Sequence, residues 1–517
     1  MKVSINLLKN NKENRHFNYF YPPIIEPWLM QTIPEQIANL TQQYAGMVPE
    51  RIEKLPPSGS NRNYYRVHLP KQSLVATYNL NTKENQTFQR FSAHFRQANL
   101  PVPAVLAMNA EHTLYLQNDL GNTSLLNVLE ADGPTPAVYA LFQKSLAMLA
   151  QLQINGHRHF PYEACLTAKE FGKQAILSDM LYFKYYFLDT LQLPYDKQAL
   201  MDDFEALGSY LTKTEHHYFM VRDFQSRNIM VLEGAVYCID FQGGMKGALQ
   251  YDVASLLWQA RANLSEDWKH RLLEYYMDCV DRLLPKPLHR TVFEGQYNGY
   301  VLIRLLQVLG AYGFRGLFER KAHFLASIPL ALQNLQFFLQ HRQMGIITPE
   351  LDRLLRLMTD APILKRFHIP KANEHTPLRV EINSFSYREG IPADTTDNGG
   401  GFVFDMRGIL NPGRINAYKH LSGMDKPVQD FLEQQTQMNV FLNSVWDVID
   451  ITIQEYMQRG FHHLQINFGC TGGQHRSVYA AEQTARHLRN KYNLKVQLTH
   501  TNRANWVTTP VIESSNL

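Results

Sequence analysis

The sequence lacks the features that mark secreted, membrane-spanning or strongly charged proteins. Its few cysteines have no paired spacing, so neither a disulfide framework nor a zinc site is expected and a reducing compartment fits. There are 51 Lys and Arg residues against 47 Asp and Glu, and the net charge of +4 favours no class of partner. At 45% hydrophobic residues, the chain is typical of a soluble globular protein of about two to four domains.

No segment is apolar for long enough to predict a signal peptide or a membrane span. The first 14 residues contain lysines and no long apolar stretch. The most apolar helix-like run, 300–314, is interrupted by Arg304 and is shorter than a bilayer requires. We therefore expect a cytoplasmic protein with no membrane partner.

The stretch from Val221 to Met230 has the clearest chemical content. Asp223 and Asn228 are five positions apart, and Asp240 follows after a short hairpin pattern. Phosphoryl transfer needs one carboxylate for the attacking hydroxyl, and an amide and a carboxylate for the metal ions on the phosphates. Each residue alone would be an ordinary turn residue, but the combination predicts the catalytic centre of a kinase-like fold.

Upstream of this centre, the pattern predicts a small nucleotide-binding lobe. Residues 1–33 form an arm without clear periodicity, and a helix opens at Pro34. A small-residue turn then leads into expected strands at 63–67 and 73–78, a helix at 82–99, and a strand at 113–117. Such a turn can bring backbone N–H groups close to phosphates, although its single glycine fits a plain β-turn equally well.

Beyond the polar hinge at 118–121, helical spacing dominates from about 124 to 211 and again from 244 to about 343, on either side of the predicted catalytic stretch. The aromatic cluster at 180–187 is more typical of a core than of a ligand platform. Asp252 opens a helical stretch and is expected to be a buried scaffold residue. The interval 351–377 ends in a polar, proline-flanked segment and is expected to be a linker.

Residues 34–350 resemble the aminoglycoside phosphotransferase-like kinases, and in particular the cell-wall amino-sugar kinases. The matching segments are 58–67, 118–121, 222–228, 240–242 and 251–252. The resemblance implies a bilobal α+β protein-kinase-like fold, ATP and Mg²⁺ as cofactors, and a sugar hydroxyl as acceptor. It further implies that Asp223 is the catalytic base, that Asn228 and Asp240 are the metal ligands, and that the nucleotide contacts are Ser58, Gly59, Ser60, Asn61, Asn118 and Leu120.

Two departures from this kinase pattern stand out. Val221 occupies a position where these kinases usually have His, and the strand 75–79 carries no Lys to pair with the phosphates. Because losing one charged clamp can remove much of the catalysis, an inert kinase-like domain that only binds nucleotide or metabolite is the alternative.

From Leu378 the pattern changes to alternating strands and helices, which predicts a second, α/β domain. Strands are expected at 378–387, 401–405 and 463–468. The last strand leads through the Gly-rich turn 469–477 to a helix starting near Val478. Backbone N–H groups and the helix dipole at such a turn favour an anion, and Arg476 could add a bidentate fork.

The same turn allows a second interpretation. Cys470 and Arg476 are separated by five residues and Ser477 follows, which is the arrangement of cysteine-dependent phosphatases. In those enzymes a thiolate attacks a phosphate held by the loop. Phosphatase activity of the second domain therefore stands as an alternative function.

Residues 378–510 resemble the C-terminal domain of the RapZ family of RNase adapter proteins. The likeness is carried by 384–390, 404–407, 421–425 and 469–477, while Gly413 stands where that family has His. The family's N-terminal P-loop motif is absent from the sequence. The resemblance implies binding of a small RNA and of glucosamine-6-phosphate, with a pocket formed by Asp405, Arg407, Cys470, Thr471, Gly472, Gly473, His475, Arg476 and Ser477.

Charge offers only limited support for RNA as a partner. Between Arg476 and Arg503 there are six basic residues against one acid, but a solvated helix surface explains them equally well. The sequence as a whole predicts an ATP-dependent small-molecule kinase, acting on an amino sugar, fused to a domain that senses a phosphorylated sugar. The competing interpretation is an RNA- or metabolite-binding regulator with an inert kinase-like half.

Overall fold

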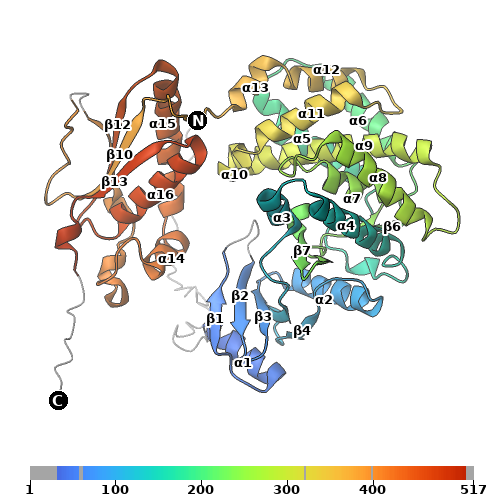
Figure 1. The fold of residues 1–517 in the computed structure, drawn as a ribbon, viewed down its shortest axis with the longest axis horizontal. Coiled ribbons are helices and arrows are strands. Elements are labelled where there is room, and N and C mark those ends of the chain that lie inside the picture. Colours follow the sequence, from blue (N-terminus) through green and yellow to red (C-terminus); the bar gives the residue numbers. More distant parts are fainter. Residues whose placement is uncertain (1–31, 57–61, 320–321, 397–399, 508–517) are drawn as a thin grey trace, which may run out of the picture. The chain divides into compact units, whose positions relative to one another are not determined.

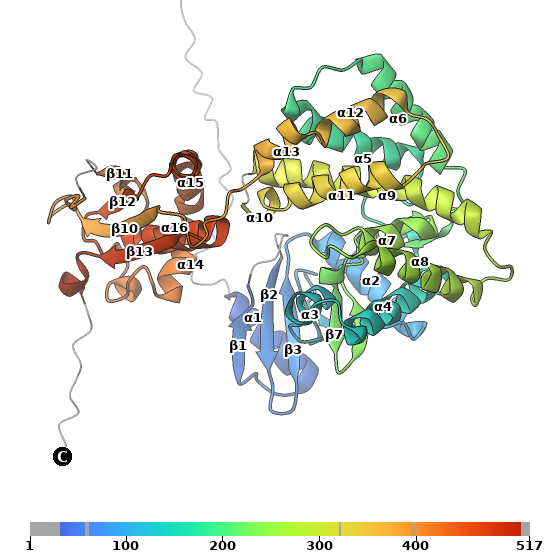
Figure 2. The same ribbon diagram turned by 45° about the horizontal axis from the view of Figure 1, so that its top comes forward.

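The computed structural model describes residues 32–56, 62–319, 322–396 and 400–507, in two compact units. One unit contains the residues up to 170 with 217–253 and 271–287, and the other contains 171–216, 254–270 and the residues from 288 onward. Figures 1 and 2 show their elements in two views. Most of the predicted N-terminal arm lies outside the described residues, as do Ser58, Gly59, Ser60 and Asn61 of the predicted phosphate turn.

A five-stranded antiparallel sheet begins the first unit. Its strand order is β1-β2-β3-β5-β4. The predicted strands are confirmed as β2 (Asn63–His68), β3 (Ser73–Tyr78) and β5 (Leu114–Asn118). The sequence did not predict β1 (Arg51–Lys54) or β4 (Val105–Met108), because these four-residue strands have no fully buried residue and so lack the apolar alternation of a half-buried strand.

Helices α1 (Ile33–Ala45) and α2 (Thr82–Gln97) pack against this sheet. Thr32 begins α1 with a capping box to Glu35, and Ile37 joins the core of the sheet. The ring of Phe88 in α2 stacks on Tyr115 of β5 and on Phe241, with ring centroids 5.4 and 4.9 Å apart. Helix α2 therefore ties the sheet to the segment that carries Asp240.

Two short two-stranded sheets hold the predicted catalytic stretch. One pairs β6 (Tyr218–Met220) with β9 (Met245–Gly247), and the other pairs β7 (Ile229–Leu232) with β8 (Ala235–Cys238), both antiparallel. The α-helices α3 (Leu125–Asp132) and α4 (Pro136–Ile154) precede them in the chain. Helices α7 (Leu249–Leu257) and α8 (Glu266–Asp281) follow them.

The second unit begins with a helical part. It is built from α5 (Lys173–Tyr186), α6 (Lys197–Leu211), α9 (Arg290–Tyr312) and α11 (Ile328–His341). In α9, a side chain on Gly310 would clash with the backbone of Phe183, so glycine lets α5 and α9 approach closely. Met180, Phe183 and Phe187 are fully buried, as expected of the aromatic cluster.

The apolar helix of this unit is longer than the sequence suggested. With the π-helical turn that continues it, α9 spans Arg290–Phe318 and is long and apolar enough to cross a membrane. The prediction that this apolar run is too short to span a membrane was therefore wrong, because the helix extends beyond 300–314 at both ends. More than half of its most apolar window, 56%, is buried inside the protein, as in the core helix of a soluble protein.

Two helices lie in the interval that we expected to be a linker. They are α12 (Pro349–Met358) and α13 (Ala361–Phe367). Leu351, Leu354, Leu355 and Met358 of α12 are fully buried. Within 351–377 the segment 368–377 has no helix or strand, whereas the helical pattern before it was missed.

The C-terminal part of the second unit is an α/β fold with a parallel sheet in the order β11-β12-β10-β13. The predicted strands correspond to β10 (Arg379–Ser386), β11 (Gly401–Asp405) and β12 (His463–Cys470). The fourth strand, β13 (Lys495–His500), was not predicted, because none of its residues is fully buried and its ends are charged or polar. Its helices are α14 (Lys426–Gln435), α15 (Met438–Arg459) and α16 (Arg476–Tyr492).

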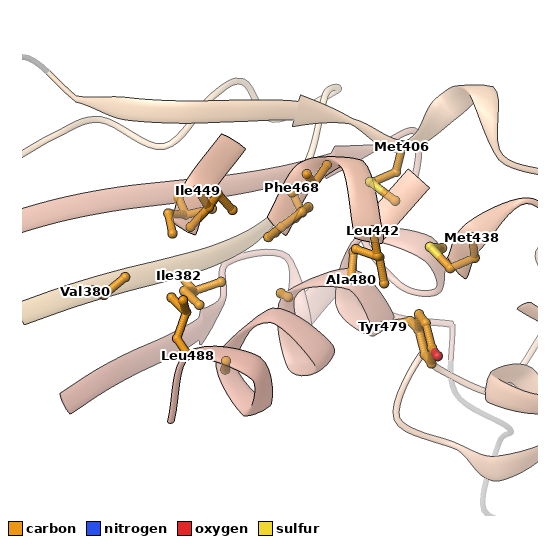
Figure 3. Close-up of a cluster of buried hydrophobic side chains, with 14 of the residues drawn as sticks. Val380, Ile382, Met406, Met438, Leu442, Ile449, Phe468, Tyr479, Ala480 and Leu488 are labelled. Carbon is orange, nitrogen blue, oxygen red and sulfur yellow. The ribbon is translucent and has the colours of Figure 1, made fainter. Parts of the chain in front are cut away.

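The core of this α/β domain lies between the sheet and its helices. Figure 3 shows Ile382 of β10 and Phe468 of β12 beside Ile449 of α15 and Leu488 of α16. All four side chains are buried. This core fixes the end of β12 and the start of α16, which are the two ends of the Gly-rich turn.

Candidate active site and anion-binding loop

The backbone leading to Asp223 is held by Asp252, a fully buried residue of α7. The backbone N–H groups of Val221 and Arg222 donate to the two carboxylate oxygens of Asp252, at 2.8 and 3.0 Å. Arg222 has a φ of 78°, in the left-handed region that side chains seldom adopt. The expected scaffold role of Asp252 is thus borne out, with backbone amides as its partners.

Asp223 and Asn228 lie together. The side-chain amide of Asn228 donates to the backbone carbonyl of Asp223 at 2.9 Å. The Asp223 carboxylate accepts hydrogen bonds from Gln225 and, at 3.3 Å, from Arg227. It is about one-third exposed, at 32%, and so is open to an incoming hydroxyl.

The β7–β8 hairpin brings Asp240 to the same place. Ile229 pairs with Cys238, and one step further the N–H of Ile239 donates to the carbonyl of Asn228 at 3.0 Å. Asp240 follows directly with a φ of 60°. Asp223, Asn228 and Asp240, predicted from their spacing alone, are therefore gathered at one end of the hairpin.

The oxygens of this end suit a magnesium ion, which prefers carboxylate and amide oxygen ligands. Asn228 is buried, yet its Oδ1 has no donor within the described ranges. Among the described residues, no group of three or more His, Cys, Asp or Glu side chains is placed to hold a metal ion. A metal here would therefore rely on Asn228 and Asp240, with the nucleotide supplying further oxygens.

Arg62, Glu84 and Gln242 surround Asp240 and were not predicted. Arg62 Nη2 lies 3.0 Å from Asp240 Oδ1 and 3.2 Å from Glu84 Oε1. The amide of Gln242 donates to Asp240 Oδ1 at 2.8 Å. The sequence contains one indirect indication of Arg62. Strand 75–79 has no lysine, so another cation would have to contact the phosphates.

The hinge residues have structural partners of their own. The side-chain oxygen of Asn118 accepts the N–H of Ala104 at 2.6 Å, and Leu120 is buried. Between them, Asp119 accepts from Arg66 and Ser73. Burial acts to raise the pKa of Asp119, but these hydrogen bonds outweigh it and hold the pKa below its ordinary value. These hydrogen bonds fix the conformation of the hinge.

The Gly-rich turn between β12 and α16 is tied down through its carbonyl groups. Ser386 donates to the carbonyl of Thr471, Asn502 to that of Gly472, and Trp506 to that of Gly473. No acceptor among the described residues takes the backbone N–H groups of 471–476. The carbonyl groups of the turn thus point into the protein, and its N–H groups are available to a ligand. At a helix N-terminus, such an arrangement suits an anion.

Cys470 and Arg476 lie within interaction distance of each other, but both side chains also have other partners. Cys470 is buried, and its Sγ lies 3.1 Å from the hydroxyl of Ser477. Arg476 Nη1 donates to the carbonyls of Arg407 and Ile409, at 3.0 and 2.7 Å. Arg476 thus fastens the segment after β11 to α16 through Nη1, while its buried Nε has no acceptor among the described residues.

Asp405 and Arg407 stand beside the turn. Asp405 pairs with Gly469 in the β11–β12 register, and its carboxylate accepts from the Arg407 guanidinium at 2.7 Å. The Arg407 hydrogen bonds lower the pKa of Asp405 below its ordinary value. The guanidinium also lies 4.0 Å from the ring centroid of Tyr387.

His475 is buried at the start of α16 and faces Gly413. Its Nε2 lies 2.9 Å from the carbonyl of Tyr418, which fits a neutral ring that donates from Nε2. Burial lowers the pKa of His475. A Cβ on Gly413 would lie 3.0 Å from the His475 ring, so the departure at 413 leaves room beside this imidazole.

The basic residues from 476 to 503 do not form one open face. Arg476 is buried, Lys491 forms an ion pair with Asp450 at 2.6 Å, and Arg489 donates to the carbonyl of Val496. Trp506 donates to the Gly-rich turn rather than offering a stacking surface. Three of the six basic groups are thus engaged within the domain, which weakens the argument for an RNA surface.

Comparison with known proteins assigns both parts of the chain. Residues 51–286 match the model of the phosphotransferase enzyme family, and residues 378–504 match that of the RapZ C-terminal domain. The two-domain prediction, a kinase-like fold followed by an α/β domain, is confirmed. The two matches cover separate segments of the chain.

Curated relatives match about a quarter of the chain. A nucleotide-binding protein of Endomicrobium trichonymphae is 39% identical over 123 residues, which are 24% of this chain and 41% of that protein. One of Lactobacillus helveticus is 37% identical over 124 residues, 24% of this chain and 40% of that protein. The chain thus spans about two fifths of the length of these relatives.

Solved structures of small-molecule kinases cover more of the chain. A choline kinase from Cryptosporidium parvum is 10% identical and covers 62% of this chain and 99% of its own, with a TM-score of 0.44. A thermostable mutant of aminoglycoside phosphotransferase APH(4)-Ia is 15% identical and covers 58% and 97%, with a TM-score of 0.39.

Proposed function

We propose that the N-terminal part of the chain is an ATP- and magnesium-dependent kinase that phosphorylates a hydroxyl of a small molecule, and that this molecule is an amino sugar of cell-wall recycling. The observation that carries the proposal is the meeting of Asp223, Asn228 and Asp240, linked by the 2.9 Å bond from Asn228 to the Asp223 carbonyl. We take the kinase domain as 34–350 and the second domain as 378–510.

Asp223 would act on the acceptor. Its partly exposed carboxylate can accept the proton of an attacking hydroxyl and orient it toward the terminal phosphate. Gln225 and Arg227 limit its rotation by hydrogen bonds. Asp252 fixes the backbone that precedes Asp223. Both the side chain and the backbone of the proposed base are therefore held by hydrogen bonds.

Asn228 and Asp240 would hold magnesium, which when bound neutralises charge on the phosphates during transfer. Both offer hard oxygen ligands at one end of the β7–β8 hairpin. On the nucleotide side we propose Ser58, Gly59, Ser60 and Asn61, with Asn118 and Leu120 near the adenine. The hydrogen bonds within the hinge support a fixed backbone there.

The amino-sugar acceptor rests on the resemblance of segments 58–67 and 222–228 to the cell-wall amino-sugar kinases. The nature of the second domain supports the same chemistry. Its turn offers a helix N-terminus and backbone N–H groups that no acceptor in the described part of the chain takes, which suit the phosphate of a phosphorylated sugar. We propose that this domain senses such a phosphosugar, with pocket residues Asp405, Arg407, Cys470, Thr471, Gly472, Gly473, His475, Arg476 and Ser477.

A cytoplasmic location fits both the metabolites and the cysteines, all four of which are free. The RNA partner implied by the RapZ resemblance remains a prediction. Binding of RNA without kinase turnover, measured by gel shift against total small RNA, would favour the inert-regulator alternative.

The test of the kinase proposal is turnover. The full chain is incubated with ATP, Mg²⁺ and a panel of N-acetyl amino sugars, and the sugar phosphate is measured. Asp223→Asn should abolish product, because the hydroxyl loses its proton acceptor. Asp132→Asn, an equivalent change at the exposed end of α3, is the matched control and should leave turnover intact. No product from any sugar by the folded protein would overturn the proposal.

A further inference from the structure

The cation that pairs with the candidate metal ligand Asp240 lies next to β2 and does not come from β3. Arg62 directly precedes β2, and the register pairs Asn63 with Tyr78 at the end of β3. Strand β3 carries no Lys or Arg. In kinases a lysine on this strand pairs with a glutamate of the following helix and contacts the phosphates. Arg62 thus lies alongside the end of the strand that lacks the lysine.

Glu84 has the place of the partner glutamate. It lies in the first turn of α2, its N–H is capped by Asn81, and its other carboxylate oxygen accepts from Asn79 at 2.9 Å. Arg62 Nη2 is 3.2 Å from Glu84 Oε1. The ion pair between sheet and helix that other kinases make with lysine is made here with arginine.

The same guanidinium reaches the candidate metal ligand. Arg62 Nη2 donates to Asp240 Oδ1 at 3.0 Å, and Nη1 donates to the hydroxyl of Tyr64 at 3.1 Å. In the part of the chain that the structure describes, Arg62 is the cation that pairs with either Glu84 or Asp240. Phosphates held near Asp240 would therefore meet this group first.

Arg62 is also incompletely satisfied. Its side chain is only 12% exposed, and its buried Nε has no acceptor among the described residues. A buried donor without a partner is unusual and calls for an explanation. A planar guanidinium matches phosphate oxygens, so a phosphate would supply the acceptor that the protein does not.

From these contacts we propose that Arg62 is the phosphate clamp of this enzyme, in place of the missing strand lysine, and that Glu84 is the residue that positions it. This inference rests on the proposed nucleotide site. The clamp acts on the β- and γ-phosphates, so its loss weakens binding of a triphosphate and leaves binding of adenosine unchanged.

The test is a binding titration of the full chain with AMP-PNP and Mg²⁺, and separately with adenosine, by calorimetry. Arg62→Ala should weaken AMP-PNP binding by about tenfold to a hundredfold, since it removes charge-assisted hydrogen bonds to phosphate. Arg62→Lys should recover part of the affinity, because it restores the charge but not the fork. Glu84→Gln should weaken AMP-PNP binding by less than Arg62→Ala does, because it disturbs the position of the guanidinium and leaves its charge.

The matched control is Arg51→Ala. Arg51 lies on β1 opposite His68, at the other end of β2, and forms an exposed pair with Glu53. It should bind AMP-PNP as the unchanged protein does. A purely structural role for Arg62 would instead lower the unfolding temperature and weaken adenosine and AMP-PNP binding alike, which would overturn the proposal.

The outcomes separate this inference from the kinase proposal. If the unchanged chain binds AMP-PNP but phosphorylates no acceptor, the kinase proposal fails while the Arg62→Ala comparison still decides the clamp. If Arg62→Ala is folded and binds AMP-PNP normally, the clamp is wrong whatever the turnover shows. If the unchanged chain binds no nucleotide, both are overturned.

Discussion

The carboxylate of Asp252 accepts the backbone N–H of Val221 at 2.8 Å, across 31 positions of the sequence. The contact is to the main chain, so it does not require the His that related kinases carry at the position of Val221. The backbone before Asp223 is thus fixed even though the local sequence departs from the kinase pattern. Val221 is therefore a weaker argument for an inert kinase-like domain than the sequence alone suggested.

We predict that Asp252→Asn destabilises the first unit and loosens the catalytic stretch. The new amide can accept from only one of the two backbone N–H groups, and a buried donor left unpaired costs about 1–3 kcal/mol. Hydrogen exchange of the peptide containing Val221 and Arg222 should become faster. Asp132→Asn serves as the control, and unchanged exchange in Asp252→Asn would contradict the scaffold role.

A second prediction concerns pH and the α/β domain. Burial acts to raise the pKa of Asp450, but the hydrogen bond from His487 and the charge of Lys491 outweigh it, so its pKa lies below the ordinary value. Because the folded-state pKa is depressed, this stabilisation is present above the unfolded value of about 3.9 and is lost as pH falls through the folded value.

The variant Asp450→Asn should therefore be less stable than the unchanged protein at pH 7, by about 1–3 kcal/mol, as expected for a buried hydrogen bond to a charged group. Its stability should also fall less steeply on acidification. The measurement is urea unfolding of the C-terminal domain signal from pH 7 to pH 3. Parallel pH profiles for the two proteins would show that the Asp450 pKa is not depressed.

The Gly-rich turn offers a matched pair of glycines. Gly473 has a φ of 61°, and a Cβ there would lie 2.8 Å from Cβ of Asn502, whereas a Cβ on Gly472 would meet no atom within 4 Å. Gly473→Ala should cost about 1–3 kcal/mol of stability through backbone strain and crowding. Gly472→Ala should stay within about 0.5 kcal/mol, and equal effects in thermal unfolding would contradict this geometry.

We predict that Cys470 is not a nucleophile. Its thiol is 3% exposed and contacts the hydroxyl of Ser477, and the guanidinium of Arg476 is engaged by backbone carbonyls. Cys470→Ser should leave any hydrolysis of a phosphate ester unchanged. Loss of hydrolysis in this variant, with unchanged phosphate affinity, would revive the phosphatase interpretation.

What the sequence predicted well were features with local patterns. Pro34 and the spacing of Ile37, Leu40 and Tyr44 predicted helix α1, and β3 and β12 are short, largely buried segments between turn signals. The spacing of Asp223, Asn228 and Asp240 was informative, because a single hairpin accounts for their meeting. These predictions needed no knowledge of distant contacts.

What the sequence could not predict depends on distant partners. Arg62 and Asp240 are 178 positions apart, so no local pattern relates them. β13 has no fully buried residue, and its place beside β10 comes from parallel pairing over more than a hundred residues. Arg476 was expected to face the ligand, but its contacts with the Arg407 and Ile409 carbonyls follow from the fold of a remote segment.

The central claim is that Asp223, Asn228 and Asp240 form a working phosphoryl-transfer site. The most direct measurement is mass spectrometry of an N-acetyl amino sugar incubated with ATP, Mg²⁺ and either the unchanged chain or Asp223→Asn. The account predicts a sugar phosphate with the unchanged chain and none above background with Asp223→Asn, although both bind AMP-PNP. Equal product from both proteins, or none from a folded chain that binds AMP-PNP, would contradict it.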